Sequence, residues 1–272
     1  MRADIIKYSN KLIIIKIIFD FIPRINFFYK IAIWYVRHYF GFNYGIHQFQ
    51  DELNVVSKIC VNGKPLIFDV GGNNGSWSIK LLQQMPDAII HMFEPSLSVY
   101  NTARDNLKGH EVTINNLALG KDIGKRKFFI YGNSEISSLH ENDNISKNET
   151  RLVDTTTIDA YCYLKKIDKI NYLKVDTEGH DFFVLKGAEK MLNDQKINCV
   201  QFEYGSPNIY SRVFLKDIIN YLKSKNYFIF RIYPSWIKPI NDYTNELENF
   251  VPVNYISVNA NMIERLKHYI KR

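Results

Sequence analysis

The sequence has little cysteine, and its three cysteines, Cys60, Cys162 and Cys199, lie far apart. Because no two of them form a CxxC or CxxxC pair, the sequence predicts neither a zinc knuckle nor a disulfide framework. A reduced, cytoplasmic setting is the simplest interpretation. Long apolar runs are also absent. The longest run among the first forty residues, 12–21, is interrupted by charged residues and is shorter than the roughly 20 apolar residues that a bilayer requires, so it predicts no transmembrane helix.

The chain nevertheless contains enough apolar residues for a full hydrophobic core. Of its 272 residues, 46% are hydrophobic and 14% are aromatic, which excludes a disordered or collagen-like protein. The formal net charge of +7 is concentrated at the N-terminus, because the first forty residues carry seven basic and two acidic side chains. The excess of positive charge is therefore local.

Residues 1–40 predict two helices, about 4–21 and 24–40, which are broken at Pro23. Both are rich in isoleucine and aromatic residues with scattered cations. We favour packing of these helices on the rest of the chain or on a second copy in a homo-oligomer. The alternative is peripheral attachment to an anionic membrane surface, for which basic, aromatic-rich amphipathic helices are typical.

From residue 65 onward, short apolar segments alternate with helical patterns, which is typical of βαβ units and a mainly parallel sheet. We expect strands at 65–70, 88–93, 112–117, 172–176, 198–204, 227–233 and 255–258. We expect helices near 76–86, 96–108, 156–166, 181–193 and 212–224. Residues 125–131 predict an extra strand, and 134–150 a polar loop that is either functional or a surface excursion. The expected organisation is a helical extension over 1–50 and one domain over 51–272.

A glycine-containing turn follows the first predicted strand, with the spacing Asp69-x-Gly71-x-x-x-Gly75. Such a turn brings the backbone close to a ligand at the carboxyl end of the strand. The dinucleotide fingerprint G-x-G-x-x-G is not met, because Asn73 and Ser76 stand at its second and third glycine positions. No Gly-Lys-Ser/Thr follows, which excludes a P-loop.

An acidic residue, Glu94, ends the next predicted strand, 23 residues after Gly71. A carboxylate at this position can accept hydrogen bonds from both hydroxyls of a ribose. The turn, the acid and the order of the strands together indicate a site for a ligand that contains a nucleoside.

These residues resemble class I S-adenosylmethionine-dependent methyltransferases, and more narrowly the FkbM family. Three further segments carry the resemblance: Asn116–Gly120, Val153–Asp159, and Leu173–Asp181 followed by Val184–Ala188. The resemblance implies a doubly wound, Rossmann-like α/β sheet of seven strands with the last one antiparallel. It implies S-adenosylmethionine as cofactor, bound by Asp69, Gly71, Asn73, Gly75, Glu94, Asn116, Ala118 and Asp176. It also implies O-methylation of a hydroxyl, with a sugar in a glycan, glycolipid or glycosylated metabolite as acceptor.

The sequence departs from the family pattern at three positions. Gly72 replaces a common alanine, and His180 and Asp181 stand where alanine and glutamate are frequent. A backbone-lined pocket tolerates the glycine. The other two departures weaken any automatic transfer of a catalytic role.

Polar groups follow the fourth predicted strand of the sheet, at the edge where such sheets bind ligands. His180 is the first candidate for a general base because an imidazole titrates near neutral pH. Asp176 or Glu178 could orient it or act directly. We expect no metal centre, although Asp176 and Glu203 would be the oxygen ligands of a divalent ion.

Two alternatives remain open. An RNA 2′-O-methyltransferase would use a Lys-Asp-Lys-Glu set, to which Lys174, Asp176 and Glu203 invite comparison, but no second lysine presents itself and the basic charge lies in the N-terminal helices. We therefore do not expect nucleic acid as a partner. A non-catalytic scaffold would lack a competent cofactor pocket, which the intact Asp69 and Glu94 argue against.

Overall fold

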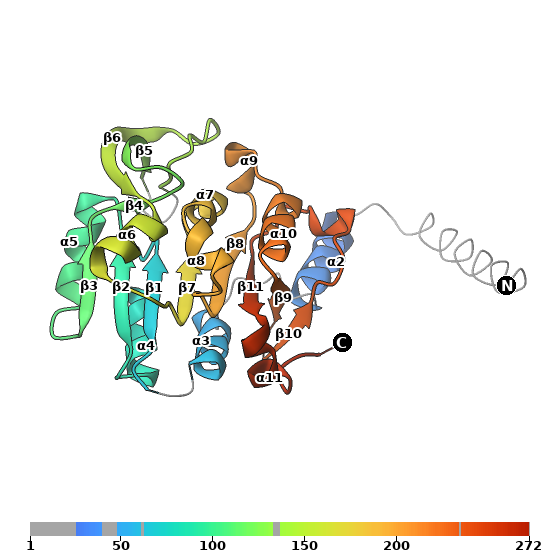
Figure 1. The fold of residues 1–272 in the computed structure, drawn as a ribbon. Coiled ribbons are helices and arrows are strands. Elements are labelled where there is room, and N and C mark those ends of the chain that lie inside the picture. The colour runs from blue at the N-terminus through green and yellow to red at the C-terminus, as the bar shows by residue number, and fades with distance from the viewer. Residues whose placement is uncertain (1–25, 40–47, 61–62, 133–136, 234, 272) are drawn as a thin grey trace, which may run out of the picture. The chain divides into compact units, whose positions relative to one another are not determined.

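The computed structural model describes residues 26–39, 48–60, 63–132, 137–233 and 235–271 (Figure 1). The chain divides into two compact units, Met1–Asn43 and Tyr44–Arg272. In the first unit, α2 (Asn26–Tyr39) matches the second predicted N-terminal helix, whereas the predicted helix 4–21 lies outside the described residues. The expected boundary after residue 50 stays a prediction. In the described ranges, no helix has both the length and the apolarity needed to cross a bilayer.

The second unit is built on an eight-stranded sheet with the order β10-β9-β11-β8-β7-β1-β2-β3. The strands are β1 (Leu66–Val70), β2 (Ile89–Phe93), β3 (Val112–Asn115), β7 (Tyr172–Val175), β8 (Cys199–Tyr204), β9 (Tyr227–Tyr233), β10 (Trp236–Pro239) and β11 (Val253–Asn259). β11 runs antiparallel to both of its neighbours. The predicted doubly wound α/β fold with an antiparallel last strand is therefore confirmed.

The predicted number of seven strands is wrong by one, because β10 pairs with β9 at the edge of the sheet. This strand has four residues and ends in Pro239. A strand so short carries little periodic signal, and proline is tolerated at an edge because no ladder hydrogen bond is required there.

The central strands β1 and β7 are buried almost throughout, as expected for parallel strands that helices cover on both faces. Two charged residues interrupt this apolar layer. Asp69 on β1 and Lys174 on β7 are register partners, and both are buried. A buried charge pair therefore lies inside the sheet, next to its carboxyl edge.

The α-helices that accompany the sheet are α3 (Gln48–Ile59), α4 (Ser76–Gln84), α5 (Leu97–Asn106), α6 (Ile158–Lys165), α7 (Asp181–Lys186), α8 (Glu189–Asn193), α9 (Asn208–Ser211), α10 (Leu215–Ser224) and α11 (Ile263–Leu266). Two short 3-10 helices, η2 (Asn245–Leu247) and η3 (Ala260–Met262), complete them. The predicted helix 181–193 is divided into α7 and α8. The Asp159 carboxylate accepts hydrogen bonds from the backbone N–H groups of Lys190 and Met191 and so starts α8 separately.

A second, three-stranded sheet consists of β4 (Ala118–Leu119), β5 (Gly124–Tyr131) and β6 (Lys147–Thr156), in the order β4-β6-β5. β5 matches the predicted extra strand. The predicted loop 134–150 is wrong at its end, because residue 147 already begins β6. Most of β6 is exposed and polar, so it lacks the alternation that marks a half-buried strand, and the backbone ladder to β5 defines it instead. Figure 1 shows this sheet beyond the carboxyl ends of β1 and β7.

The turns that leave β1 and β7 touch at Gly71. This residue has a φ of 79°, and a Cβ atom added to it would lie 1.8 Å from the backbone oxygen of Asp176. The Asp176 backbone N–H donates to the Val70 oxygen at 2.9 Å. Both the left-handed conformation and the close approach therefore require glycine.

We expect Gly71→Ala to lower the free energy of unfolding by roughly 2–5 kcal/mol, from about 1–2 for the left-handed conformation and about 1–3 for overpacking. The matched control is Gly109→Ala, because Gly109 has a φ of 90° but no atom within 4 Å of an added Cβ. The control should lose only about 1–2 kcal/mol. Urea unfolding of both variants measures the difference, and an equal loss would contradict the close approach.

Candidate active site

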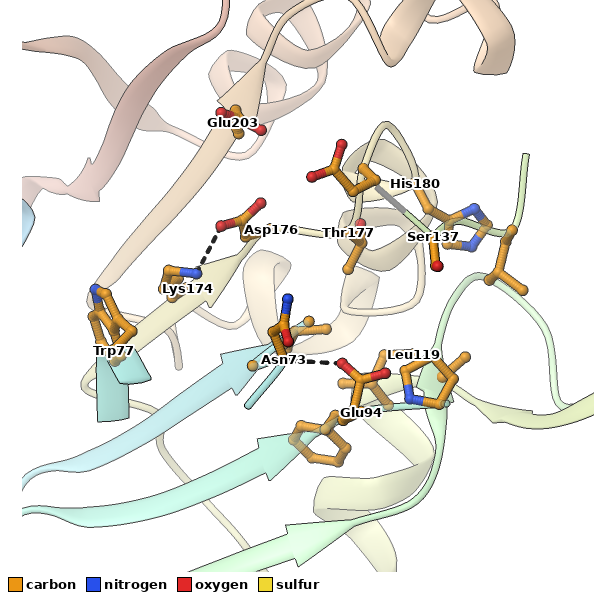
Figure 2. A pocket seen from close by; sticks show the side chains of 18 of the residues that line it. Asn73, Trp77, Glu94, Leu119, Ser137, Lys174, Asp176, Thr177, His180 and Glu203 are labelled. Carbon is orange, nitrogen blue, oxygen red and sulfur yellow. Dashed lines mark hydrogen bonds and ion pairs between the residues drawn. The ribbon is translucent and has the colours of Figure 1, made fainter. Parts of the chain in front are cut away.

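A cavity of about 470 Å³ opens at the carboxyl ends of β1, β2 and β7 (Figure 2). Open α/β sheets bind ligands at this edge, where the strand order reverses. The turns after the three strands form its walls, together with residues near Leu119 and Ser137. The predicted site residues that line it are Gly71, Asn73, Glu94, Ala118, Asp176, Glu178, His180 and Glu203.

Glu94 presents a carboxylate at the end of β2, held by two backbone groups. Its Oε2 accepts a hydrogen bond from the Asn73 N–H at 3.1 Å, and its Oε1 accepts one from the Ser96 N–H at 2.8 Å (Figure 2). The residue is 7% exposed, and burial raises the pKa of the carboxyl to about 7. Apolar side chains line the same cavity: Phe93, Pro95, Leu117 and Leu119.

Three predicted cofactor residues do not line the cavity but support the segments that do. Asp69 accepts a hydrogen bond from the Ser78 hydroxyl at 2.7 Å. Asn116 donates its side-chain amide to the backbone oxygens of Glu94 at 2.9 Å and Pro95 at 3.0 Å. Gly75 starts α4 with a φ of 82°. The structure thus places all three beneath or beside the wall of the cavity.

The departure from the family pattern at Gly72 has a packing explanation. A Cβ atom at this position would lie 2.6 Å from the Cγ and Cε atoms of Met92. The Met92 side chain therefore occupies the space that an alanine methyl group would need.

Lys174 is a buried cation at the floor of the cavity. It is 3% exposed, and its Nζ lies 3.0 Å from Asp176 Oδ2 and 3.7 Å from Asp69 Oδ1 (Figure 2). Burial alone would lower the pKa of Lys174, but the carboxylates of Asp176, Asp69 and Glu52 together raise it above its ordinary value. The ammonium group therefore stays charged.

Glu52 is a buried member of this cluster that the sequence analysis missed. Its carboxylate accepts hydrogen bonds from Trp77 Nε1 and Asn254 Nδ2, each at 3.0 Å. Burial raises its pKa to about 7. One signal could have found it, because Glu52 shares a helical face with Val55, Val56 and Ile59 at spacings of three, four and seven residues.

Three carboxylates gather at the rim of the cavity, from the ends of two strands. Asp176 and Glu178 follow β7 and Glu203 lies in β8, and one oxygen of each lies within 4.8 Å of the other two. Burial, Asp176 and Glu203, in this order, raise the pKa of Glu178 to about 9. These three carboxylates can accept a proton or attract a cation. They include both predicted metal ligands, Asp176 and Glu203, and the predicted catalytic residue Glu178.

Asp181 fixes the spacing of these carboxylates, although it lies outside the cavity. Its Oδ2 accepts hydrogen bonds from the N–H of Thr177 at 3.2 Å and from the Thr177 hydroxyl at 2.8 Å. Its Oδ1 accepts one from the Glu203 N–H at 3.2 Å. A single buried side chain thus links the ends of β7 and β8.

His180 is buried beside a second histidine, and no acid is its hydrogen-bond partner among the residues that the structure describes. Its Nδ1 lies 2.9 Å from Nε2 of His140, and its ring stacks on Phe183 at a centroid distance of 4.8 Å. Burial lowers the pKa of His180 to about 3 and that of His140 to about 4. The imidazole of His180 is therefore neutral and weakly basic. His140 was not predicted as a site residue, because its spacing in the chain gives no hint of this contact.

A family model described as "Methyltransferase FkbM domain" matches residues 69–229, which is more than half of the chain. The chain belongs to the FkbM methyltransferase family. The resemblance stated from the sequence is therefore confirmed, and the matched region contains both the turn after β1 and the carboxylates after β7 and in β8.

A curated relative of this FkbM family member is Methyltransferase 1 of Beauveria bassiana (strain ARSEF 2860). The two are 27% identical over an alignment of 144 positions, which covers 45% of this chain and 58% of the relative. The alignment thus spans little more than half of the relative's length.

Two solved structures are similar to this one at low sequence identity. Precorrin-6y C5,15-methyltransferase from Geobacter metallireducens GS-15 is 15% identical, with a TM-score of 0.42 over 76% of this chain and 86% of that one. TrmK of M. capricolum, in complex with S-adenosyl-homocysteine, is also 15% identical, with a TM-score of 0.42 over 81% of this chain and 70% of that one.

The residues of this FkbM cavity fit S-adenosylmethionine. The Glu94 carboxylate has acceptor capacity left beyond its two backbone bonds and suits the two ribose hydroxyls. The apolar wall suits the adenine ring, and the turn at Gly71 keeps the backbone of β1 open to the ligand. Asp176 lies where it would attract the ammonium group of the methionine part.

We expect S-adenosylhomocysteine to bind about tenfold more weakly at pH 6 than at pH 8, from proton linkage at one carboxyl. The free protein holds a proton on Glu94 below its raised pKa of about 7, and the ribose hydroxyls bind the ionised form. The dissociation constant should therefore fall as the pH rises. Calorimetric titration at the two pH values measures this difference.

The Glu94→Gln variant tests whether ionisation of Glu94 causes this pH dependence. It should bind S-adenosylhomocysteine about 10- to 100-fold more weakly than the unmodified protein at pH 8, as loss of a hydrogen bond to a charged group implies, and with little pH dependence. Glu111→Gln, at an exposed position, is the control. A Glu94→Gln variant with unchanged affinity would show that this carboxylate does not bind the ligand.

Proposed function

We propose that this protein transfers the methyl group of S-adenosylmethionine to a hydroxyl of a sugar in a glycan, glycolipid or glycosylated metabolite. One observation carries the proposal. Glu178 and Glu203 line the cavity that fits the cofactor and also line a second cavity of about 480 Å³. Carboxylates therefore stand between a site for the donor and a site for an acceptor.

When bound, S-adenosylmethionine supplies an electrophilic methyl group, whose bond to sulfur breaks as the acceptor oxygen bonds to carbon, and S-adenosylhomocysteine keeps the electron pair. The protein aligns the hydroxyl and receives its proton. We assign the proton to Glu178, because it lines both cavities and because its carboxylate, once ionised above a pKa of about 9, is a stronger base than the imidazole of His180. Asp176 accepts a hydrogen bond from Lys174. In this proposal it binds the cofactor and balances the positive charge of the Lys174 ammonium group.

Charge in the two cavities supports a sugar acceptor over RNA. Among the described residues that line the first cavity, Lys174 is the one lysine or arginine, and carboxylates already surround it. A phosphate backbone requires a basic track along the cleft. The charge of the rim is instead acidic.

The partners expected of residues 1–40 remain proposals. Residues 28–35 of α2 include exposed aromatic and aliphatic side chains, among them Tyr29 and Ile31. Such a face suits either a second copy of the chain or a membrane surface with anionic lipids. The cytoplasmic location likewise stays a prediction.

We expect Glu178→Gln to lower kcat about 10²- to 10⁴-fold, as the loss of a general base typically does. The dissociation constant for S-adenosylhomocysteine should stay within experimental error. Transfer of a labelled methyl group under single-turnover conditions measures the rate, with Glu111→Gln as control. Undiminished turnover of Glu178→Gln would remove this residue from the chemistry, and abolition of wild-type turnover by a chelator would make the carboxylates ligands of a metal instead.

The acceptor class has a direct test with labelled S-adenosylmethionine. We expect label in neutral oligosaccharides or glycosides and none in a structured RNA transcript of matched concentration. Heat-denatured protein is the control for non-enzymatic transfer. Label in the RNA alone would contradict the proposed acceptor while leaving methyl transfer intact.

A further inference from the structure

The second cavity lies among loops at the carboxyl edge of the large sheet. Its walls come from the segment 137–146 between β5 and β6, from the turn before α9 together with α9 itself, and from Pro252 just before β11. It shares Glu178 and Glu203 with the first cavity. A ligand here would therefore meet the same carboxylates as a ligand in the first cavity.

Hydrogen bonds fix the position of the outer wall. The Ser138 hydroxyl donates to the backbone oxygen of Glu178 at 2.7 Å. Farther out, Asn144 Nδ2 donates to the Tyr210 hydroxyl at 2.8 Å and so links the segment 137–146 to α9. Two elements that line the cavity are thus held together by a hydrogen bond, as expected of a preformed binding site.

The chemistry of the walls is selective. The acidic side chains that line the second cavity are Glu178 and Glu203, and none of the described lining residues is a lysine or an arginine. The other polar groups are amides, hydroxyls and the imidazole of His140, whose lowered pKa leaves it neutral. The apolar residues Ile145, Pro207 and Pro252 also line the cavity. The hydroxyl groups and C–H faces of a sugar ring match this combination of polar and apolar groups.

We propose that the second cavity is the acceptor site and that it takes an uncharged sugar ring and rejects a phosphorylated one. This inference rests on the proposed sugar O-methylation. An anionic group in the cavity would lie near the acidic cluster of Asp176, Glu178 and Glu203, and no lysine or arginine is among the described residues that line the cavity. Repulsion between like charges grows as water is excluded. The two carboxylates therefore set both the place of the reaction and the charge of its acceptor.

Ser206 offers a test of this selectivity by gain of function. It lines the cavity, its side chain is exposed, and it lies in the turn before α9. Ser206→Lys introduces a cation there, and Ser206→Met introduces a chain of similar length without charge. The probes are a methyl glycoside that the wild type methylates and the phosphate monoester of the same glycoside.

We expect the ratio of kcat/KM for the phosphate ester to that for the neutral glycoside to rise about tenfold or more in Ser206→Lys, as a partly screened ion pair implies. Ser206→Met should leave the ratio unchanged, and added salt should diminish the gain. Because a misfolded variant cannot gain activity, the result does not depend on an equal stability of the variants. Binding of S-adenosylhomocysteine verifies the first cavity in each protein.

Failure of the inference differs from failure of the proposed function. If the wild type methylates glycosides but the ratio is the same in Ser206→Lys and Ser206→Met, the acceptor binds elsewhere and the inference is overturned while sugar methylation stands. If the wild type methylates the phosphate ester as well as the neutral glycoside, the charge selectivity is wrong. If no glycoside accepts the methyl group and another class of compound does, the proposed function falls and the inference falls with it.

Discussion

The ammonium group of Lys174 is the charge on which the edge of the sheet depends. It lies inside the protein between β1 and β7, and an unpaired ammonium group at such a depth would be strongly destabilising. Asp69 and Asp176 approach it from these two strands, and Glu52 adds a third carboxylate from α3. The balance of these charges brings together segments that are far apart in the chain, and it orients Asp176 toward the cavity.

The pairing of Lys174 with buried carboxylates leaves the rim of the site acidic. The charge of Lys174 is neutralised beneath the cavity, so it does little to offset Glu178 and Glu203, which lie farther out. Asp181 holds the strand ends that carry them at a fixed separation. Burial, together with Asp176 and Glu203, raises the pKa of Glu178, and the same carboxylates would repel the anionic acceptor that we propose the site rejects. In this arrangement, the same cluster of carboxylates determines the basicity of Glu178 and the charge of the proposed acceptor.

The sequence predicted those features that depend on neighbours along the chain. The turn at Gly71 and the acid at Glu94 follow from a strand, a glycine and a spacing, and both line the cavity. The contact between His140 and His180 and the burial of Glu52 depend on segments that meet only after folding. Without knowledge of those segments, an acid on a helix looks exposed and a histidine looks like a base. Strand β6 was missed for a related reason, since its pairing with β5 rather than its side chains defines it.

Since many unrelated reactions use one α/β fold, the sheet by itself does not select the acceptor. Selection falls to the loops, and here two of them meet: the segment 137–146 and the turn that leads into α9. Their contact through Asn144 and Tyr210 bounds a cavity that has a wall in common with the cofactor site. In the reaction that we propose, a hydroxyl held in that cavity would lie beside Glu178, and this carboxylate would set its position and receive its proton. For this reason the chemical nature of the acceptor is to be sought in the side chains of these two loops.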